Sequence, residues 1–506
     1  MILSRYTLKN INNNLVDVPD ESLFELPEKV LQFGTGALLR GLPDYYIDKA
    51  NRNGIFNGRV VVVKSTTQGD ASSFNRQDSL YTLCVRNPAN DNKSETNTIS
   101  SAISRVLVAA EEWGEVLKCA HNQQLQIIIS NTTETGIRLI HDDVGSHPPA
   151  SFPGKLLSFL YERFKAFGGS ELSGMIIIPT ELIPDNGKKL ESIVLELAHL
   201  NGLEDEFIEW VEKCNSFCNS LVDRIVPGKP EEEFQLQIAA QLGYIDNLLT
   251  IAEPYSLWAI EGDESIKKIL SFAQADETVI VQPDIENFRE LKLRLLNGTH
   301  TLASGLAFLT GCQTVKEAME NDALASFITK LMQDEIAHAI PARVSLIAAQ
   351  SFGKQVLERF NNPHIRHQWL NITLQYTSKM KMRCIPVLLK HYEINKKVPE
   401  LIALGFAAYL LFTKPVIRRN LQYYGERHGE TYLIQDDMAE VFYKRWSTFD
   451  VPELVQDVLN DIDCWGHDLS ELPGFVQSVT EKLNAMTSND IKGIIESVVS
   501  KKDIAA

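Results

Sequence analysis

The segment 290–300 carries the residues with the clearest chemical potential, Lys292, Asn297 and His300. On an α-helix, at about 100° per residue, Asn297 lies about 140° and His300 about 80° around the axis from Lys292, so the three can share one face. A desolvated lysine can accept the proton of an alcohol or return it to a carbonyl. Asparagine and histidine can stabilise the charge that develops on that oxygen during hydride transfer. The pattern predicts a metal-free oxidoreductase site with Lys292 as general acid/base; a solvated helix with an incidental histidine is the alternative.

A glycine-containing loop precedes this segment by some 250 residues and predicts where a cofactor binds. The apolar run 29–33 reads as a strand, and Gly34-Thr35-Gly36 then opens a helical stretch. This order is typical of a dinucleotide site, where glycines let the backbone approach a pyrophosphate at a helix N-terminus. The third glycine of GxGxxG is replaced by Leu39, with Gly41 two residues late, so an ordinary strand-to-helix turn is the alternative. The predicted cofactor contacts in this loop are Gly34, Thr35, Gly36 and Leu38.

The ends of two further strands are expected to lie beside the same dinucleotide site. The run 59–63 ends at Lys64, where an acidic residue would bind the ribose hydroxyls of NAD. Lys64 could instead favour a 2′-phosphate or line the adenosine pocket, so the residues alone leave NAD and NADP open. The strand-like run 125–130 is followed by a loop in which Thr132 and Glu134 are predicted to contact the cofactor, with Glu134 a possible proton relay. A loop with a capping threonine is the alternative.

The order of these elements predicts the fold. Continuous apolar runs at 29–33, 59–63, 125–130 and 174–179, separated by helical stretches, indicate a parallel sheet covered on both faces. After about residue 285 the chain becomes mostly helical, with one helical stretch spanning 287–310. We therefore expect an α/β protein, with a Rossmann-like, dinucleotide-binding domain over 1–285 and a mostly α-helical substrate and catalytic domain over 286–506. The apolar stretch 401–412 is too short to cross a bilayer and predicts a buried helix.

Composition narrows the class of protein. The 506 residues include 66 acidic and 49 basic side chains, and the net charge of −17 argues against nucleic acid as a partner. Seven scattered cysteines form neither a disulfide framework nor a zinc set, and no metal is expected. The N-terminus lacks the apolar stretch of a signal peptide, so a cytoplasmic protein with no membrane partner is expected. The oligomeric state stays open.

Several motifs, in order, resemble the mannitol dehydrogenase family of long-chain polyol dehydrogenases, which use NAD(P) without zinc. The resemblance runs from about residue 29 to about residue 480. It departs from the family signature at Asn215, where an apolar residue is expected. The matching pieces are Gly34-x-Gly36 with Leu38-Leu39-Arg40, Gln77-Asp78-Ser79-Leu80-Tyr81-Thr82, Ser151-Phe152-Pro153-Gly154-Lys155-Leu156, Val222-Asp223-Arg224-Ile225-Val226-Pro227, Glu253-Pro254-Tyr255, Lys292-x4-Asn297-x2-His300, and the segment 357–370.

This resemblance implies a reaction and the roles of particular residues. The implied reaction is reduction of a small-molecule sugar acid, D-tagaturonate, to D-altronate in hexuronate catabolism, with NAD(H) as cofactor. Lys292 would be the general acid/base, and Asn297 and His300 would hold the reacting oxygen. Asn186 matches a substrate-binding asparagine, and Lys379 matches a basic position near the substrate. Fructuronate, mannitol or arabinitol as substrates remain alternatives within the family, and a nucleotide-binding module without chemistry is an alternative outside it.

A sugar acid needs a cation for its carboxylate, and the stretch 359–383 supplies several within an acidic chain. Arginine would bind a carboxylate bidentately and lysine as a point charge. From this stretch we predict Arg366 and Lys379 as substrate contacts; a solvated helical face is the alternative for any single residue. The basic residues of the stretch are Arg359, His364, Arg366, His367, Lys379, Lys381 and Arg383.

Overall fold

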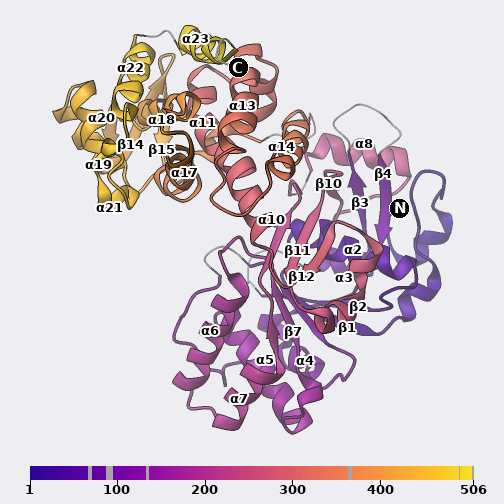
Figure 1. The fold of residues 1–506 in the computed structure, drawn as a ribbon. Helices are drawn as coiled ribbons and strands as arrows, with labels where there is room; N and C mark the ends of the chain where they lie inside the picture. Colours follow the sequence, from indigo (N-terminus) through magenta and orange to yellow (C-terminus); the bar gives the residue numbers. More distant parts are fainter. Residues whose placement is uncertain are drawn as a thin grey trace. The chain divides into compact units, whose positions relative to one another are not determined.

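The structure, a computed structural model, describes residues 1–65, 71–86, 95–132, 136–228, 230–362, 367–488 and 491–503. The chain packs as two compact units, Met1–Ile285 and Glu286–Ala506. The first is built on a parallel sheet and the second is mostly helical (Figure 1). The predicted fold class, a Rossmann-like domain followed by a mostly α-helical one, is confirmed.

The main sheet of the first unit has six parallel strands in the order β5-β2-β1-β6-β7-β8. From β1 the chain adds strands on one side and then returns to add them on the other, so the order reverses between β1 and β6. This is the Rossmann order, in which a ligand binds at the carboxyl ends of the strands beside that reversal. The strands are β1 (Glu28–Phe33), β2 (Arg59–Lys64), β5 (Ile103–Val108), β6 (Ile127–Ser130), β7 (Ile176–Pro179) and β8 (Ser216–Phe217).

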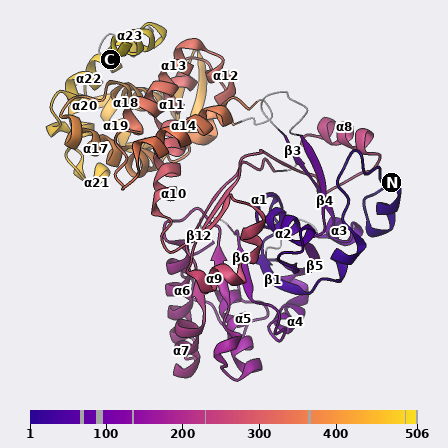
Figure 2. The ribbon, with the colours of Figure 1, turned by 45° about the vertical axis from the view of Figure 1, so that its right-hand side comes forward.

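Both faces of this sheet are covered by helices (Figures 1 and 2). Alternate side chains of a strand point to opposite faces. Val60 and Val62 accordingly join one hydrophobic core, while Val61 and Val63 join the other. The helices of this unit are α1 (Ala37–Gly41), α2 (Pro43–Arg52), α3 (Ser72–Arg76), α4 (Ala109–Cys119), α5 (Phe152–Phe167), α6 (Asn186–Leu200), α7 (Asp205–Cys214), α8 (Glu232–Leu242) and α9 (Glu264–Ile269).

Two three-stranded sheets complete the first unit, in the orders β10-β3-β4 and β12-β11-β9. Their strands are β3 (Tyr81–Val85), β4 (Thr96–Ser100), β9 (Ser220–Asp223), β10 (Thr250–Ala252), β11 (Leu257–Glu261) and β12 (Val279–Gln282).

The second unit is built around α18 (Glu400–Phe412), which is buried on almost every side and packs against α11 and α22. The predicted buried helix over 401–412 is therefore confirmed. The carboxylate of Glu335 accepts the backbone N–H groups of Leu401 and Ile402, at 3.1 and 2.9 Å, and so caps the N-terminus of α18. No helix among the described residues is both long and apolar enough to cross a membrane.

The remaining elements of this unit include a small antiparallel sheet that the sequence did not lead us to expect. Its strands are β13 (Ile417–Arg419), β14 (Gln422–Arg427) and β15 (Glu430–Ile434). The helices are α10 (Glu286–Leu291), α11 (Thr299–Leu309), α12 (Val315–Met319), α13 (Asp322–Lys330), α14 (Leu346–Phe360), α15 (Trp369–Ile372), α16 (Tyr376–Lys379), α17 (Ile385–Asn395), α19 (Ala439–Thr448), α20 (Val451–Leu459), α21 (Ile462–Trp465), α22 (Phe475–Thr487) and α23 (Ile491–Asp503).

Three π-helical segments interrupt these helices: η6 (Lys292–Gly298), η7 (Leu331–Ile336) and η8 (Met380–Cys384). The stretch 287–310, predicted as one helix, is thus α10, η6 and α11 in succession. The apolar pattern of so short a segment is the same for either helix type, so the sequence does not reveal the change. Short π-helical turns are frequent at functional sites.

Candidate functional site

Gly34 marks the point where the order of the parallel strands reverses. It directly follows β1 and has a φ of +130°, which favours glycine. A Cβ atom there would lie 2.8 Å from Leu39 Cδ1 and 2.9 Å from the carbonyl oxygen of Asn131, just after β6. The loops that follow β1 and β6 are therefore in close contact. This is the place where a dinucleotide binds in a Rossmann sheet.

Gly36 lies on the open side of the same loop. It is exposed, it precedes the first turn of α1, and no atom lies within 4 Å of the position its Cβ would take. The helical stretch expected after this loop is broken at Leu42, and Pro43 begins α2. Proline is favoured at the first position of a helix because an N–H there would have no partner within the helix, so its absence costs nothing.

Gly41 explains why the third glycine of the fingerprint is displaced. Its Cβ would lie 2.8 Å from Val226 Cγ2, and its carbonyl accepts a 2.6 Å hydrogen bond from Arg224. Close packing is the usual role of the third glycine, and here it falls at Gly41 because α1 ends there. Leu39 is fully buried and packs against Gly34.

The guanidinium of Arg40 fixes the glycine loop through hydrogen bonds, a role that the sequence did not suggest. Its Nη1 donates to the carbonyl oxygen of Thr35 at 2.7 Å, and its Nε donates to Thr250 Oγ1 at 3.0 Å. The hydroxyl of Tyr81 donates to the carbonyl of Arg40 at 2.9 Å. The peptide between the two glycines is thereby fixed.

Leu38 was also predicted to contact the cofactor. Its side chain is partly buried and packs against the hydrophobic core that contains Leu39.

Lys64 and Thr132 lie at the carboxyl ends of β2 and β6, the two strands that flank β1. Lys64 is the last residue of β2 and pairs with Val108 of β5. Thr132 follows β6 and donates both its N–H and its hydroxyl to Glu181 Oε1, at 2.8 and 3.0 Å. Glu181, which sequence reasoning missed, follows β7, is 3% exposed and also accepts the hydroxyl of Ser130 at 3.1 Å. Burial raises the pKa of Glu181.

Asn186 lies at the start of α6, inside the first unit, and is 1% exposed. Its Nδ2 lies 3.0 Å from the carbonyl oxygens of Pro179, Glu181 and Ser220. Its Oδ1 accepts the N–H groups of Ser220 and Gly187, both at 2.9 Å. These contacts join β7, β9 and α6, so in this geometry the side chain is engaged with the backbone rather than open to a ligand.

Lys292 and Asn297 are brought together by η6. In a π-helical turn the hydrogen bonds join residues five apart. Lys292 and Asn297 therefore lie one turn apart on the same side, and the separation of about 140° expected for an α-helix does not apply. His300 follows in the first turn of α11. Lys292 is 7% exposed and Asn297 is half-buried.

His300 is enclosed by rings. It is 5% exposed, stacks on Phe360 with ring centroids 4.3 Å apart, and meets His367 and Trp369 edge-on at 4.9 and 6.0 Å. Its Nε2 is buried and has no hydrogen-bond partner among the described residues. A buried polar atom without a hydrogen bond costs free energy unless a ligand forms a hydrogen bond with it. Burial lowers the pKa of His300 well below its usual range, so the ring is neutral near pH 7.

Among the described residues, the side chains that act electrostatically on His300 are basic. After burial, His367, Arg383, Arg359 and Lys379 each lower its pKa further. Lys379 Nζ donates to the carbonyl of Ile372 at 2.8 Å. These residues come from α14, α16, η8 and the segment before α15, so basic side chains that are distant in the sequence act together on His300 in a chain whose net charge is −17.

Lys381, from the same basic stretch, is directed elsewhere. It is exposed and its Nζ donates to the carbonyl of Asp463 at 3.2 Å. The predicted contacts Glu134 and Arg366, and also His364, lie outside the residues that the structure describes.

A buried ion pair braces η6. Arg294 binds the carboxylate of Glu290 through Nε and Nη2, at 2.9 and 3.1 Å, and each side chain is only 8% exposed. Arg294 Nη1 also donates to the carbonyl of Arg383 at 3.2 Å. The pair therefore ties the segment that carries Lys292 to η8, which carries Arg383.

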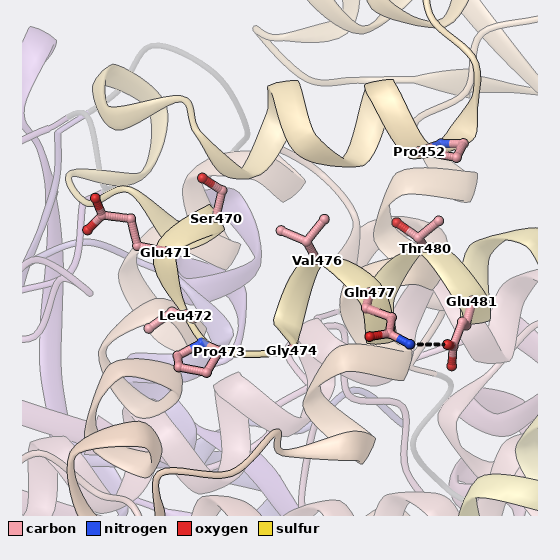
Figure 3. A pocket seen from close by; sticks show the side chains of 10 residues that line it. All are labelled: Pro452, Ser470, Glu471, Leu472, Pro473, Gly474, Val476, Gln477, Thr480 and Glu481. Carbon is pink, nitrogen blue, oxygen red and sulfur yellow. Dashed lines mark hydrogen bonds between the residues drawn. The ribbon is translucent and has the colours of Figure 1, made fainter.

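The second unit has a groove of about 500 Å³ beside η9 (Leu469–Glu471) and α22 (Figure 3). Gln477 and Glu481 are joined there by a 2.9 Å hydrogen bond. None of Lys292, Asn297 or His300 lines it. The seven cysteines are free, and no group of three or more potential metal ligands occurs in the described part of the chain.

A parallel sheet with a glycine loop at its reversal point, followed by a helical unit with a buried lysine, asparagine and histidine, defines the class of two-domain dehydrogenases. The sequence pattern of the mannitol dehydrogenase Rossmann domain matches residues 28–273, and that of the mannitol dehydrogenase C-terminal domain matches residues 284–487. The chain belongs to the mannitol dehydrogenase family and is an oxidoreductase acting on CH–OH groups. The family and the fold support a nicotinamide cofactor.

Similar proteins carry the name altronate oxidoreductase. The one from Halalkalibacterium halodurans is 36% identical over 94% of each chain. The one from Escherichia coli O7:K1 is 37% identical over 94% of this chain and 97% of its own. Among solved structures, mannitol 2-dehydrogenase from Pseudomonas fluorescens, a ternary complex with NAD and D-mannitol, matches with a TM-score of 0.75 at 22% identity, covering 99% of this chain and 100% of that one. A D-sorbitol dehydrogenase matches with a TM-score of 0.76 at 21% identity, covering 98% and 100%.

Proposed function

We propose that this chain catalyses the NADH-dependent reduction of D-tagaturonate to D-altronate, and the reverse oxidation, in hexuronate catabolism. The observation that carries the proposal is the environment of His300, a buried ring with an unpartnered Nε2 surrounded by basic residues. A site of this kind suits a sugar that is both polar and anionic. The altronate oxidoreductases that are 36–37% identical over 94% of the chain support the same substrate class.

In the proposed mechanism, Lys292 delivers a proton to the carbonyl oxygen of the substrate during reduction and removes it during oxidation. Asn297 and His300 hold that oxygen, and His300 acts as a neutral hydrogen-bonding ring because burial lowers its pKa. Bound NADH would supply the hydride. The π-helical turn that aligns Lys292 with Asn297 supports their acting on one atom.

The two units would divide the work. We propose that residues 1–285 bind the cofactor along the carboxyl edge of the main sheet, using Gly34, Thr35, Gly36, Lys64 and Thr132. The open space above Gly36 and the close contact at Gly34 support a pyrophosphate approaching this loop. Residues 286–506 would supply Lys292, Asn297, His300 and the cations for the substrate. NAD is proposed over NADP from the family resemblance.

A substrate panel tests this proposal. The purified protein would be mixed with tagaturonate, fructuronate, fructose or xylulose, each with NADH and with NADPH, and oxidation of the cofactor followed by its absorbance. Fastest turnover of tagaturonate with NADH is expected. Preference for fructuronate or for a neutral ketose would assign a different member of the family, and turnover with none would contradict a dehydrogenase role.

Two variants test the mechanism. Lys292→Ala should lower kcat by a factor on the order of 10²–10⁴, the usual contribution of a general acid/base. Lys381→Ala is the matched control, because this lysine is exposed and directed to Asp463. Full activity of Lys292→Ala would contradict the assigned role and leave the substrate assignment intact.

A further inference from the structure

The imidazole of His300 packs against three aromatic rings that differ in orientation. Phe360 lies almost parallel to it, with ring centroids 4.3 Å apart and an interplanar angle of 13°. Trp369 and His367 meet it edge-on, at 83° and 84°, with centroids 6.0 and 4.9 Å away. A parallel neighbour fixes the tilt of a ring but lets the ring turn about its normal, and perpendicular neighbours stop that rotation. The three contacts together therefore hold the imidazole in one orientation.

Phe360 and Trp369, which we call the aromatic clamp, come from helices packed on the segments that carry the site. Phe360 is the last residue of α14, which packs against η6, and Trp369 begins α15, which packs against α11. Both side chains are buried, at 5% and 0% exposure. The backbone N–H of Trp369 also donates to the carbonyl of Gln313 at 3.0 Å. The aromatic clamp therefore belongs to the packed core of the second unit.

Packing has to orient His300 because Nε2 makes no hydrogen bond with the described residues, although this atom is buried. Histidines in active sites are commonly oriented by a hydrogen bond at one ring nitrogen. Here the rings on its face and edges hold this side of the imidazole. A group that binds a reacting oxygen is effective only when its position is fixed closely, so the packing of His300 bears directly on the reaction.

Phe360 also acts on the charge of the imidazole. Its hydrocarbon face keeps water from one face of His300, and burial is the largest cause that lowers the pKa of His300 well below its usual range. A phenyl face attracts a cation, which acts in the opposite direction, but the lowered pKa means that desolvation outweighs this attraction. The titratable side chains that act on His300 among the described residues also lower its pKa: His367 before α15, Arg383 on η8, Arg359 on α14 and Lys379 on α16.

We propose that Phe360, together with Trp369, is a positioning residue for the reaction: the aromatic clamp fixes the plane of His300 and excludes water from its face, so that a neutral imidazole meets the substrate oxygen. This inference rests on the proposed function, in which His300 holds that oxygen. A charged imidazolium would repel the ammonium form of Lys292, which has to give a proton to the same oxygen. The aromatic clamp acts through His300 and does not need to touch the substrate.

The charge of His300 tests this inference without any turnover. The protein would be labelled with 13C-histidine and titrated by NMR, and the resonance lost in His300→Asn identifies His300. Phe360→Ala opens one face of the imidazole to water and should raise the pKa of His300 by about one unit, a tenfold gain in proton affinity. Phe360→Tyr, which retains a flat ring, should titrate like wild type.

Phe442→Ala is the matched control. Phe442 is fully buried in the same unit, and its ring packs edge-on against Tyr409 with centroids 5.7 Å apart. Its removal should lower the free energy of unfolding by a comparable amount and leave the titration of His300 unchanged. Phe360→Leu and Phe442→Leu serve if the alanine variants do not fold. A His300 titration that is the same in the Phe360 variant and wild type, or that moves equally in the Phe442 variant, would overturn the inference.

Steady-state kinetics with tagaturonate and NADH give a second readout. Phe360→Ala should lower kcat about tenfold or more, because a displacement of about 1 Å can cost a factor on the order of 10². Its kcat should also fall on the acid side as His300 gains a proton, a step that wild type lacks, while KM for NADH stays the same. Phe360→Tyr should recover most of the lost kcat, and Phe442→Ala should keep kcat within about twofold of wild type.

Equal losses of kcat in Phe360→Ala and Phe442→Ala would show that Phe360 only stabilises the fold, and would overturn the inference. Absence of uronate turnover in wild type would instead contradict the proposed function. The NMR titration of His300 separates the two failures, because it needs no substrate.

Discussion

The carboxylate of Glu181 accepts two hydrogen bonds from Thr132, one from its N–H at 2.8 Å and one from its hydroxyl at 3.0 Å. The contact joins the loop after β6 to the loop after β7, at the edge where the cofactor is proposed to bind. Because Glu181 also accepts the hydroxyl of Ser130, one buried side chain fixes the path of the chain as it leaves β6. The hydrogen bond to Glu181 thereby fixes the orientation of the Thr132 side chain.

Glu181→Gln should loosen this loop, since an amide has one oxygen and one NH₂ group and cannot accept all three hydrogen bonds from Thr132 and Ser130. Losing a hydrogen bond to a charged group costs about 1.5–3 kcal/mol, so we expect KM for NADH to rise roughly tenfold or more. KM for the sugar substrate should change much less, because the loop belongs to the cofactor unit. Steady-state kinetics with each substrate varied in turn would show this, and an equal rise in both constants would argue against it.

Gly34 and Gly36 should respond differently to alanine. Gly34→Ala places a Cβ 2.9 Å from the carbonyl of Asn131 at a φ of +130°, so the free energy of unfolding should fall by about 1–3 kcal/mol. Gly36→Ala meets no neighbour within 4 Å and should unfold like wild type. It should nevertheless bind NADH more weakly, because the methyl group occupies the approach of the pyrophosphate. Thermal unfolding together with NADH fluorescence titration separates the two effects, and weak binding without any contrast in stability would contradict the assignment.

Asp44 makes the stability of the first unit depend on pH. It is fully buried on α2, and burial raises its pKa to about 7, opposed by Gln32, whose Nε2 lies 3.4 Å from its Oδ2. A raised pKa means that the folded state holds the proton more tightly than the unfolded state, so this contribution to stability is lost as the pH rises from about 4 to about 7.

Asp44→Asn should remove that loss, because the amide is neutral at every pH. The free energy of unfolding of the variant minus that of wild type should be larger at pH 8 than at pH 5, by on the order of 1–2 kcal/mol. Urea unfolding at the two pH values measures the difference. Asp450→Asn is a control, because Asp450 caps α20 on the exposed surface. A gap that stays constant between pH 5 and pH 8 would show that Asp44 does not titrate in this range.

His300→Ala should lower kcat by roughly 10²–10³, the cost of removing one donor to the developing oxyanion. Because burial lowers the pKa of His300 well below its usual range, its titration should not appear in kcat between pH 6 and pH 8. A pH–rate profile of wild type checks the second point and NADH titration of the variant checks that the cofactor unit is intact. A His300 titration near pH 6.5 would show that the ring is not desolvated as described.

Two of the sequence motifs that suggested the family serve the framework in this structure. In the Ser151-Phe152-Pro153-Gly154-Lys155 segment, Ser151 Oγ accepts the N–H of Gly154 and caps α5, and Lys155 Nζ donates to the carbonyl of Ala150. In the Arg224 segment, Nε donates to the carbonyl of Glu253 at 2.9 Å and Nη1 to Gly41. A motif can therefore identify the family without containing a group that touches a ligand.

The order of local patterns determined most of the fold from the sequence alone. Continuous β-branched runs predicted strands buried on both faces, and the glycine loop after the first strand predicted the crevice at β1. The apolar stretch 401–412 predicted a buried helix. These features depend on residues near one another in the chain, so they can be predicted without knowledge of the tertiary structure.

The tertiary structure alone decided which distant groups share a site. The spacing of Lys292 and Asn297 read as part of an α-helix, and the π-helical turn puts them one turn apart. Glu181 could not be connected to Thr132, nor His367 to His300, because each pair is joined only when remote segments pack. The net charge of −17 likewise gave no hint that several basic side chains act on His300, because the position of a charge in a folded chain depends on packing rather than on composition.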